Sequence, residues 1–231
     1  MNAIECQVHL LEPLTPNVHK VLLKPEKSID FLPGQYLNFV MSEEDKRPFS
    51  IASAPGDEFI ELQIGAFGAD SYPMQVIERL NASDSVTIEM PLGNAQLRTD
   101  SDRPLLLLAG GTGFSYIKSM FEYLAARGSD RTVIVYWGLR EPGACYELEK
   151  TEQTIARLAN ASFIPVVENP TAEWQGKTGL VHEVVMQDIV SFEPYDIYLA
   201  GRFDMVGRIR QDFVEQGALL EHMYADAFAF I

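Results

Sequence analysis

The chain has 231 residues, of which 47% are apolar and 22% charged, as in an ordinary globular protein with material for one large or two small domains. Its formal net charge of −15 argues against nucleic acid and anionic membrane as partners, because both require a basic face. No apolar run approaches the roughly 18 residues that span a bilayer. Cys6 and Cys145 lie far apart in the sequence and are expected to be free thiols in the cytoplasm.

The first part of the chain, up to about residue 98, predicts short antiparallel strands. Runs of alternating or β-rich residues are separated by turn-forming clusters at 32–34 and 54–57, a spacing typical of a small barrel or sandwich. One helix is expected at about 71–80, before the last strand. The expected strands cover 6–11, 18–24, 36–41, 59–64 and 85–90. We predict an N-terminal antiparallel β-barrel.

After a polar stretch that ends at Pro104, strands and helices alternate. This alternation predicts a parallel sheet with helices on both faces, and ligands of such sheets lie at the carboxyl ends of the strands. We therefore expect two domains, 1–98 and 99–231, the second being a nucleotide-binding α/β domain. Its strands are expected at 105–109, 132–137, 162–167, 196–200 and 223–225, and its helices at 114–127, 146–158, 181–190 and 203–216.

Glycines directly follow the first strand of the α/β part. The apolar run 105–109 leads into Gly110-Gly111-Thr112-Gly113, and a helix is expected next. Glycine lets the backbone approach an anion, while the helix N-terminus offers free N–H groups and the positive end of a dipole. The pattern indicates a phosphate site at the switch position of the sheet, although such turns without a nucleotide are common.

A second segment, Arg47-Pro48-Phe49-Ser50, precedes the glycines by about 60 residues. It places a guanidinium and a hydroxyl on either side of a Pro-Phe pair, which suits an anionic, planar ligand. Alone it would also fit a turn with a surface arginine. Together the two segments indicate two ligands held against each other, one of them a dinucleotide.

Five segments carry a resemblance to a known family. Arg47 to Ser50, Gly110 to Tyr116, Tyr136-Trp137-Gly138, Ala200 to Phe203 and the terminal Asp226 to Ile231 are similar to those of the bacterial NAD(P)H-flavin reductases within the ferredoxin-NADP reductase family. The similarity extends to the flavin reductases of luminescence operons. It implies a flavin-binding barrel, a nucleotide-binding α/β domain and hydride transfer across the cleft between them.

The resemblance also implies roles for individual residues. Ser50 would be the catalytic residue, bonding near flavin N5, and Arg47 would face the ribityl chain or its phosphate. Arg140 could meet a 2′-phosphate of the nucleotide, which neighbouring Glu141 would oppose. The implied flavin-binding residues are Arg47, Pro48, Phe49, Ser50, Gln63, Ile64, Gly65, Ala66, Thr112 and Phe228. The implied NAD(P)-binding residues are Gly110, Gly111, Thr112, Gly113, Arg140, Gly201 and Arg202.

The chain departs from its relatives at two places. Where many relatives have Cys-Gly-Pro, it has Ala200-Gly201-Arg202, which offers no thiol. After Gly93 it lacks the loop that grips the pyrophosphate of tightly held FAD. Flavin is therefore expected to be a dissociable substrate. The histidines have no metal-ligand spacing and the cysteines form no cluster, so no metal or iron–sulfur site is expected.

The predicted function is NAD(P)H-dependent reduction of free riboflavin, FMN or FAD, with reduced flavin released to flavin-consuming enzymes by diffusion. Three alternatives stay open. The chain could hold its flavin and pass electrons to a protein acceptor. It could be dedicated to FMN supply in a luminescence operon. It could also be a nucleotide sensor without catalytic activity.

Overall fold

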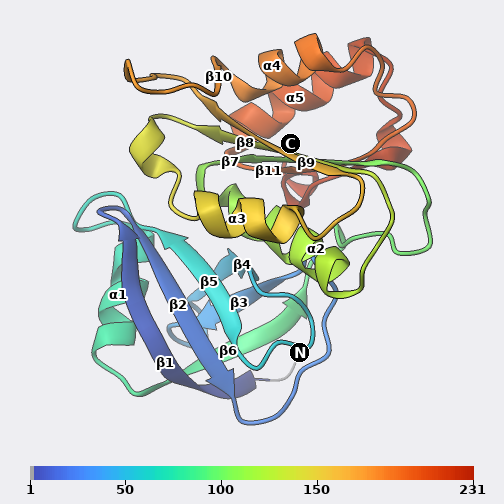
Figure 1. The fold of residues 1–231 in the computed structure, drawn as a ribbon. Coiled ribbons are helices and arrows are strands. Elements are labelled where there is room, and N and C mark those ends of the chain that lie inside the picture. The colour runs from blue at the N-terminus through green and yellow to red at the C-terminus, as the bar shows by residue number, and fades with distance from the viewer. Residues whose placement is uncertain (1–2) are drawn as a thin grey trace.

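The computed structural model describes residues 3–231, which form two six-stranded sheets (Figure 1). All strand pairs of the first sheet are antiparallel, in the order β4-β3-β6-β1-β2-β5. Just after β4, the backbone N–H of Ala52 donates to the carbonyl of Glu61 in β5 at 2.8 Å, which brings the two edges together. This confirms the predicted antiparallel barrel. Its strands are β1 (Ala3–Thr15), β2 (Val18–Pro25), β3 (Tyr36–Val40), β4 (Lys46–Ser50), β5 (Ile60–Gly65) and β6 (Ser85–Leu92).

The barrel contains one α-helix, α1 (Tyr72–Asn81), between β5 and β6. Ser71 caps it by accepting the backbone N–H of Met74 at 3.3 Å. Val76 and Leu80 from one face of this helix are buried in the barrel core. The helix therefore starts and packs as its sequence predicts.

In the second sheet all strand pairs are parallel, in the order β10-β9-β8-β7-β11-β12. Its longest helices, α2 and α5, have 13 residues each, and no helix within residues 3–231 is long and apolar enough to cross a membrane. The elements are β7 (Leu105–Gly110), α2 (Phe114–Ala126), β8 (Val133–Leu139), α3 (Leu148–Ile155), β9 (Ala161–Val167), β10 (Lys177–Thr178), α4 (Val181–Asp188), β11 (Asp196–Ala200), α5 (Phe203–Glu215) and β12 (Met223–Tyr224).

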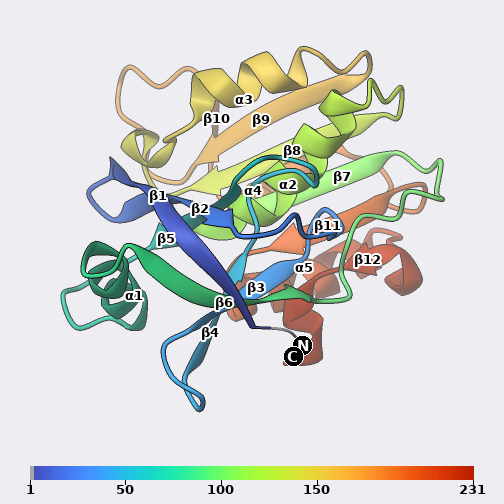
Figure 2. The same cartoon turned by 90° about the horizontal axis from the view of Figure 1, so that it is seen from below.

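Helices cover both faces of the parallel sheet. Along β7, Leu105 and Leu107 pack in the core with α2 and α3, whereas Leu106 and Leu108 pack in the core with α4 and α5. Because successive strand residues point to opposite faces, a strand buried on both faces reads as an unbroken apolar run. In Figure 1, α2 and α3 lie between the parallel sheet and the barrel, with α4 and α5 on the far side. Figure 2, seen from below, shows the barrel strands in front of the parallel sheet.

Two strands of the structure, β4 and β10, are absent from the sequence prediction. β4 was not expected as a strand because Arg47 and Pro48 interrupt any apolar alternation, and proline is tolerated there because β4 is an edge strand. β10 has only two residues, too few to give a pattern. Ala95 and Leu97 already pack in the core around α2, before the predicted boundary at residue 98. The division into domains 1–98 and 99–231 stays a prediction.

Candidate active site

A cavity of about 820 Å³ lies between the barrel and the parallel sheet. One wall comes from β4 and β5, and the other from the carboxyl ends of β7, β8 and β11. Because β7 lies between β8 and β11, the strand order reverses here, as the sequence predicts for the glycine segment. Predicted site residues that line the cavity are Pro48, Phe49, Ser50, Gln63, Gly65, Gly110, Gly111, Thr112, Gly113, Arg140, Gly201 and Arg202.

The glycines after β7 form a tight turn that leads directly into α2. Gly111 has a φ of +54°, a left-handed conformation that favours glycine. A Cβ at Gly113 would lie 2.6 Å from the carbonyl carbon and oxygen of Ala200, so only glycine permits this approach to β11. On the other side, Trp137 Nε1 donates to the Gly111 carbonyl at 2.8 Å. The turn is thus held by both neighbouring strands, with the N-terminus of α2 behind it.

The last three residues of strand β4, Pro48, Phe49 and Ser50, line the cavity, whereas Arg47 points away from it. Arg47 and Ser50 are an odd number of residues apart along the strand, so their side chains point to opposite faces. The Arg47 guanidinium donates to both carboxylate oxygens of Asp45 at 2.9 and 2.6 Å. It also donates to the Tyr72 carbonyl at 2.6 Å and to Gln75 Oε1 at 2.8 Å. The implied contact of Arg47 with the flavin is therefore not supported by its position.

Strand β5 directs its side chains alternately to the cavity and away from it. Gln63 and Gly65 line the cavity, while Ile64 and Ala66 are buried in the barrel core. A Cβ at Gly65 would lie 2.9 Å from Thr112 Cγ2, so the barrel touches the glycine turn at this point. Of the four flavin-binding residues predicted in this segment, Gln63 and Gly65 therefore line the cavity, and Ile64 and Ala66 do not.

Charged residues line the cavity where the strands of the parallel sheet end. Arg140 follows β8 and Arg202 follows β11, and both side chains are exposed to solvent. Glu168, which follows β9, is an acidic neighbour that the sequence prediction did not include. Arg140 and Arg202 can therefore pair with the phosphate groups of a nucleotide that lies over the glycine turn.

The C-terminal segment reaches the cavity through Asp226 and Ala227 rather than through Phe228. Phe228 packs against the core around α4 and α5, with its ring centroid 4.9 Å from the guanidinium carbon of Arg210. Burial raises the pKa of Asp226 to about 6. The sequence prediction missed Asp226, although a carboxylate just after β12 must lie at the carboxyl edge of a parallel sheet.

Comparisons with known proteins agree with this arrangement. The oxidoreductase NAD-binding domain family matches residues 107–211. The whole chain is 43% identical to the NAD(P)H-flavin reductase of Vibrio harveyi and 42% identical to that of Aliivibrio fischeri, with 99% of each chain covered in both cases. The chain belongs to the NAD(P)H-flavin reductase family. The resemblance found in the sequence is thereby confirmed.

Solved structures share the fold of this chain. The ferredoxin reductase in carbazole 1,9a-dioxygenase matches with a TM-score of 0.87 and 24% identity, covering 98% of this chain and 69% of that one. A ferredoxin NADP+ reductase from Neisseria gonorrhoeae with bound FAD and NADP matches with a TM-score of 0.81 and 18% identity, covering 95% and 94%. At these identities the likeness concerns the fold alone, and it confirms the predicted barrel followed by an α/β sheet.

Proposed function

We propose that this protein transfers a hydride from NADH or NADPH to free riboflavin, FMN or FAD and releases the reduced flavin. The observation that carries the proposal is that one cavity is shared by β4 and β5 of the barrel and by the glycine turn of the parallel sheet. The names of the relatives from Vibrio harveyi and Aliivibrio fischeri support it, because both are NAD(P)H-flavin reductases.

In this proposal each sheet binds one of the two substrates. The flavin ring lies along Pro48 to Ser50 and against Gln63 and Gly65. The nicotinamide nucleotide lies over the glycine turn, with Gly201 beside the nicotinamide and Arg140 and Arg202 near its charged groups. Hydride passes from the nicotinamide to flavin N5, and both substrates supply the electronic chemistry.

The chain itself orients the substrates. Holding both rings in contact makes the transfer effectively unimolecular. The Ser50 hydroxyl lies at the end of β4 on the cavity side and bonds near N5, which fixes the ring in register with the nicotinamide. The step requires no nucleophile from the protein.

The flavin is expected to dissociate after reduction. Arg47, the arginine of the expected flavin segment, donates its guanidinium hydrogen bonds to Asp45, Tyr72 and Gln75 and does not line the cavity, so it is not placed to meet a flavin phosphate. Affinity then comes from the ring, which riboflavin, FMN and FAD share, and is expected in the micromolar range, on the order of −8 kcal/mol. Reduced flavin would reach flavin-consuming enzymes by diffusion, in the cytoplasm, where the free thiols Cys6 and Cys145 stay reduced.

The test is dialysis and an absorbance spectrum, followed by NADH and NADPH oxidation with each of the three flavins. We expect a nearly colourless protein with dissociation constants for riboflavin, FMN and FAD that agree within about tenfold, because a charge-assisted phosphate bond of about 1.5–3 kcal/mol is absent. Stoichiometric FAD after dialysis would instead indicate a reductase that serves a protein acceptor. Absence of nucleotide oxidation with every flavin would indicate a nucleotide sensor.

A further inference from the structure

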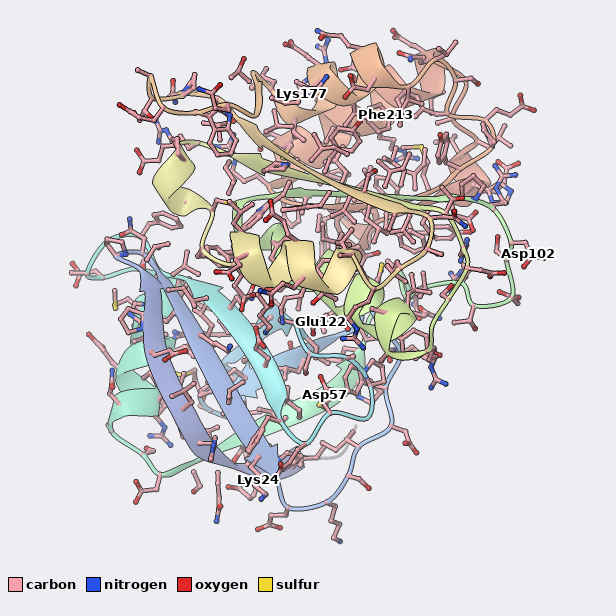
Figure 3. The ribbon with its side chains drawn as sticks, viewed as in Figure 1. Lys24, Asp57, Asp102, Glu122, Lys177 and Phe213 are labelled. Atoms are coloured by element: carbon pink, nitrogen blue, oxygen red, sulfur yellow. The ribbon has the colours of Figure 1, made fainter. Side chains whose placement is uncertain are left out.

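A cluster of charged side chains is buried between the barrel and α2, directly behind the cavity. Lys118 is 1% exposed, Glu61 6% and Glu147 7%. Buried charges destabilise a fold unless they are paired, so a balanced cluster is needed at this depth. Figure 3 labels Glu122, which lies between the helices of the parallel sheet and the barrel. The cluster consists of Lys20, Lys118, Glu61, Glu122 and Glu147, with the half-exposed Lys150 at its edge.

Lys118 is at the centre of this cluster. Its Nζ lies 3.0 Å from Glu61 Oε1 and 3.1 Å from Glu122 Oε1, and 4.0 Å from Glu147 Oε2. Burial opposes the charge of Lys118, but the three carboxylates outweigh it and raise the pKa of the ammonium group. Burial likewise opposes the charge of Glu61, while Lys118 and Lys20 lower the pKa of that carboxyl group. Lys118 and Glu61 are therefore both charged at neutral pH.

The cluster holds the amide of Gln63, a residue of the cavity wall. Gln63 Nε2 donates to Glu61 Oε1 at 3.0 Å and to Glu147 Oε2 at 2.6 Å. Gln63 Oε1 accepts from Ser115 Oγ at 3.3 Å and from the Tyr146 hydroxyl at 3.1 Å. With acceptors on one side and donors on the other, the amide has a single orientation.

The same contacts join the two halves of the molecule. Glu61 and Gln63 belong to the barrel, whereas Lys118 lies on α2 and Glu147 directly precedes α3. We propose that Lys118 is a positioning residue that acts through Glu61 and Glu147 to fix the Gln63 amide and to set the separation between the barrel and α2. The inference rests on the proposed function, in which one substrate binds to each side of this junction.

Loss of this positioning should affect substrate binding and hydride transfer differently. Each substrate contacts its own sheet, so its affinity alone depends little on the spacing of the sheets. Hydride transfer requires both rings at the correct separation, and a misplacement of about 1 Å can lower a rate by about 100-fold. Loss of Lys118 should therefore lower kcat far more than it weakens flavin binding.

The experiment compares Lys118→Met with Lys24→Met. Lys24 forms an exposed ion pair with Glu58 at 3.0 Å, so its replacement removes the same charge at the surface. For Lys118→Met we expect kcat for NADH oxidation with riboflavin to fall about 10- to 100-fold. The riboflavin dissociation constant, measured by flavin fluorescence, should change less than about threefold, and Lys24→Met should match the wild type in both measurements.

A double-mutant cycle with Gln63→Leu tests whether Lys118 acts through Gln63. If it does, Lys118→Met causes little further loss of kcat in the Gln63→Leu background. Losses that multiply, an unchanged kcat in Lys118→Met, or a parallel loss of flavin binding each overturn the inference.

Should Lys118→Met fail to fold, Lys118→Met with Glu61→Gln keeps the charges balanced and keeps an acceptor for Gln63. The same loss of kcat is expected from this pair, and wild-type turnover in it overturns the inference. If the wild type reduces no flavin, the proposed function and this inference are both overturned. If the wild type is active and the Lys118 variants have the same turnover, only the inference is overturned.

Discussion

Replacing Gly111 with alanine is expected to weaken nicotinamide-nucleotide binding and to leave flavin binding unchanged. Gly111 lines the cavity, and a Cβ there would have no protein atom within 4 Å, so the added methyl group enters open space that the nucleotide is proposed to fill. Crowding of this kind costs about 1–3 kcal/mol, which corresponds to a roughly 5- to 150-fold higher dissociation constant for NADH. Riboflavin affinity should hold because β4 and β5 form the opposite wall.

Gly128 provides a matched control at the other end of α2. Its φ of +59° resembles the +54° of Gly111, and a Cβ at either position meets nothing within 4 Å. Both alanine variants therefore lose roughly 1 kcal/mol of stability from the left-handed backbone, and only Gly111→Ala should lose NADH affinity. Thermal unfolding, NADH titration and riboflavin fluorescence separate the two effects. Equal NADH affinities in the two variants would show that the nucleotide does not lie on this turn.

Three further changes test single residues of the cavity. Ser50→Ala should keep the fold and slow flavin reduction about 5- to 150-fold, the loss of one bond of about 1–3 kcal/mol, and wild-type turnover would remove Ser50 from the mechanism. Arg140→Ala should lower the use of NADPH relative to NADH by about 3- to 10-fold, whereas an unchanged ratio would make Arg140 an ordinary surface residue. Because the pKa of Asp226 is raised to about 6, ionisation of this carboxyl group destabilises the fold as the pH rises from 4 to 6, and Asp226→Asn removes that contribution. Urea unfolding at pH 4 and 7.5 should show this variant gaining about 1–2 kcal/mol over the wild type at the higher pH, after allowance for partial solvation of the carboxyl group.

The fold was largely predictable because its main elements have strong local patterns. The leucine run 105–108 is buried on both faces of a central strand. Such an unbroken apolar run is typical of a strand inside a parallel sheet. β4 could not be predicted in this way. It is an edge strand that pairs only with β3 within residues 3–231. Its sequence, with a buried arginine next to an exposed proline, shows no apolar alternation.

The part of the site that depends on backbone conformation, the glycine turn, could be predicted from its motif. The direction in which individual side chains point from a strand was harder to predict. The glycine turn lies where its sequence indicates. Arg47 and Ser50 were assigned to one ligand because they are close in sequence, but their side chains lie on opposite faces of β4 and only Ser50 lines the cavity. The buried cluster escaped prediction, although α2 carries a readable signal of polar residues at positions i, i+3, i+4 and i+7 in an otherwise apolar helix. That stripe consists of Ser115, Lys118, Ser119 and Glu122.

The register of α2 against β5 shows how binding and positioning are linked in the proposed function. Moving along β5 in steps of two residues, Gly65 meets Thr112, Gln63 meets Ser115 and Glu61 meets Lys118. Each step of two along the strand thus matches a step of three along the start of the helix, so the cavity-facing side of β5 lies along one side of α2. Because the same helix begins at the glycine turn, its first turns in the proposed function both receive the nucleotide and hold the wall against which the flavin lies. A shift of α2 would therefore move the two proposed substrates relative to each other, and for this reason we assign the charges that fix it to the proposed mechanism as well as to the fold.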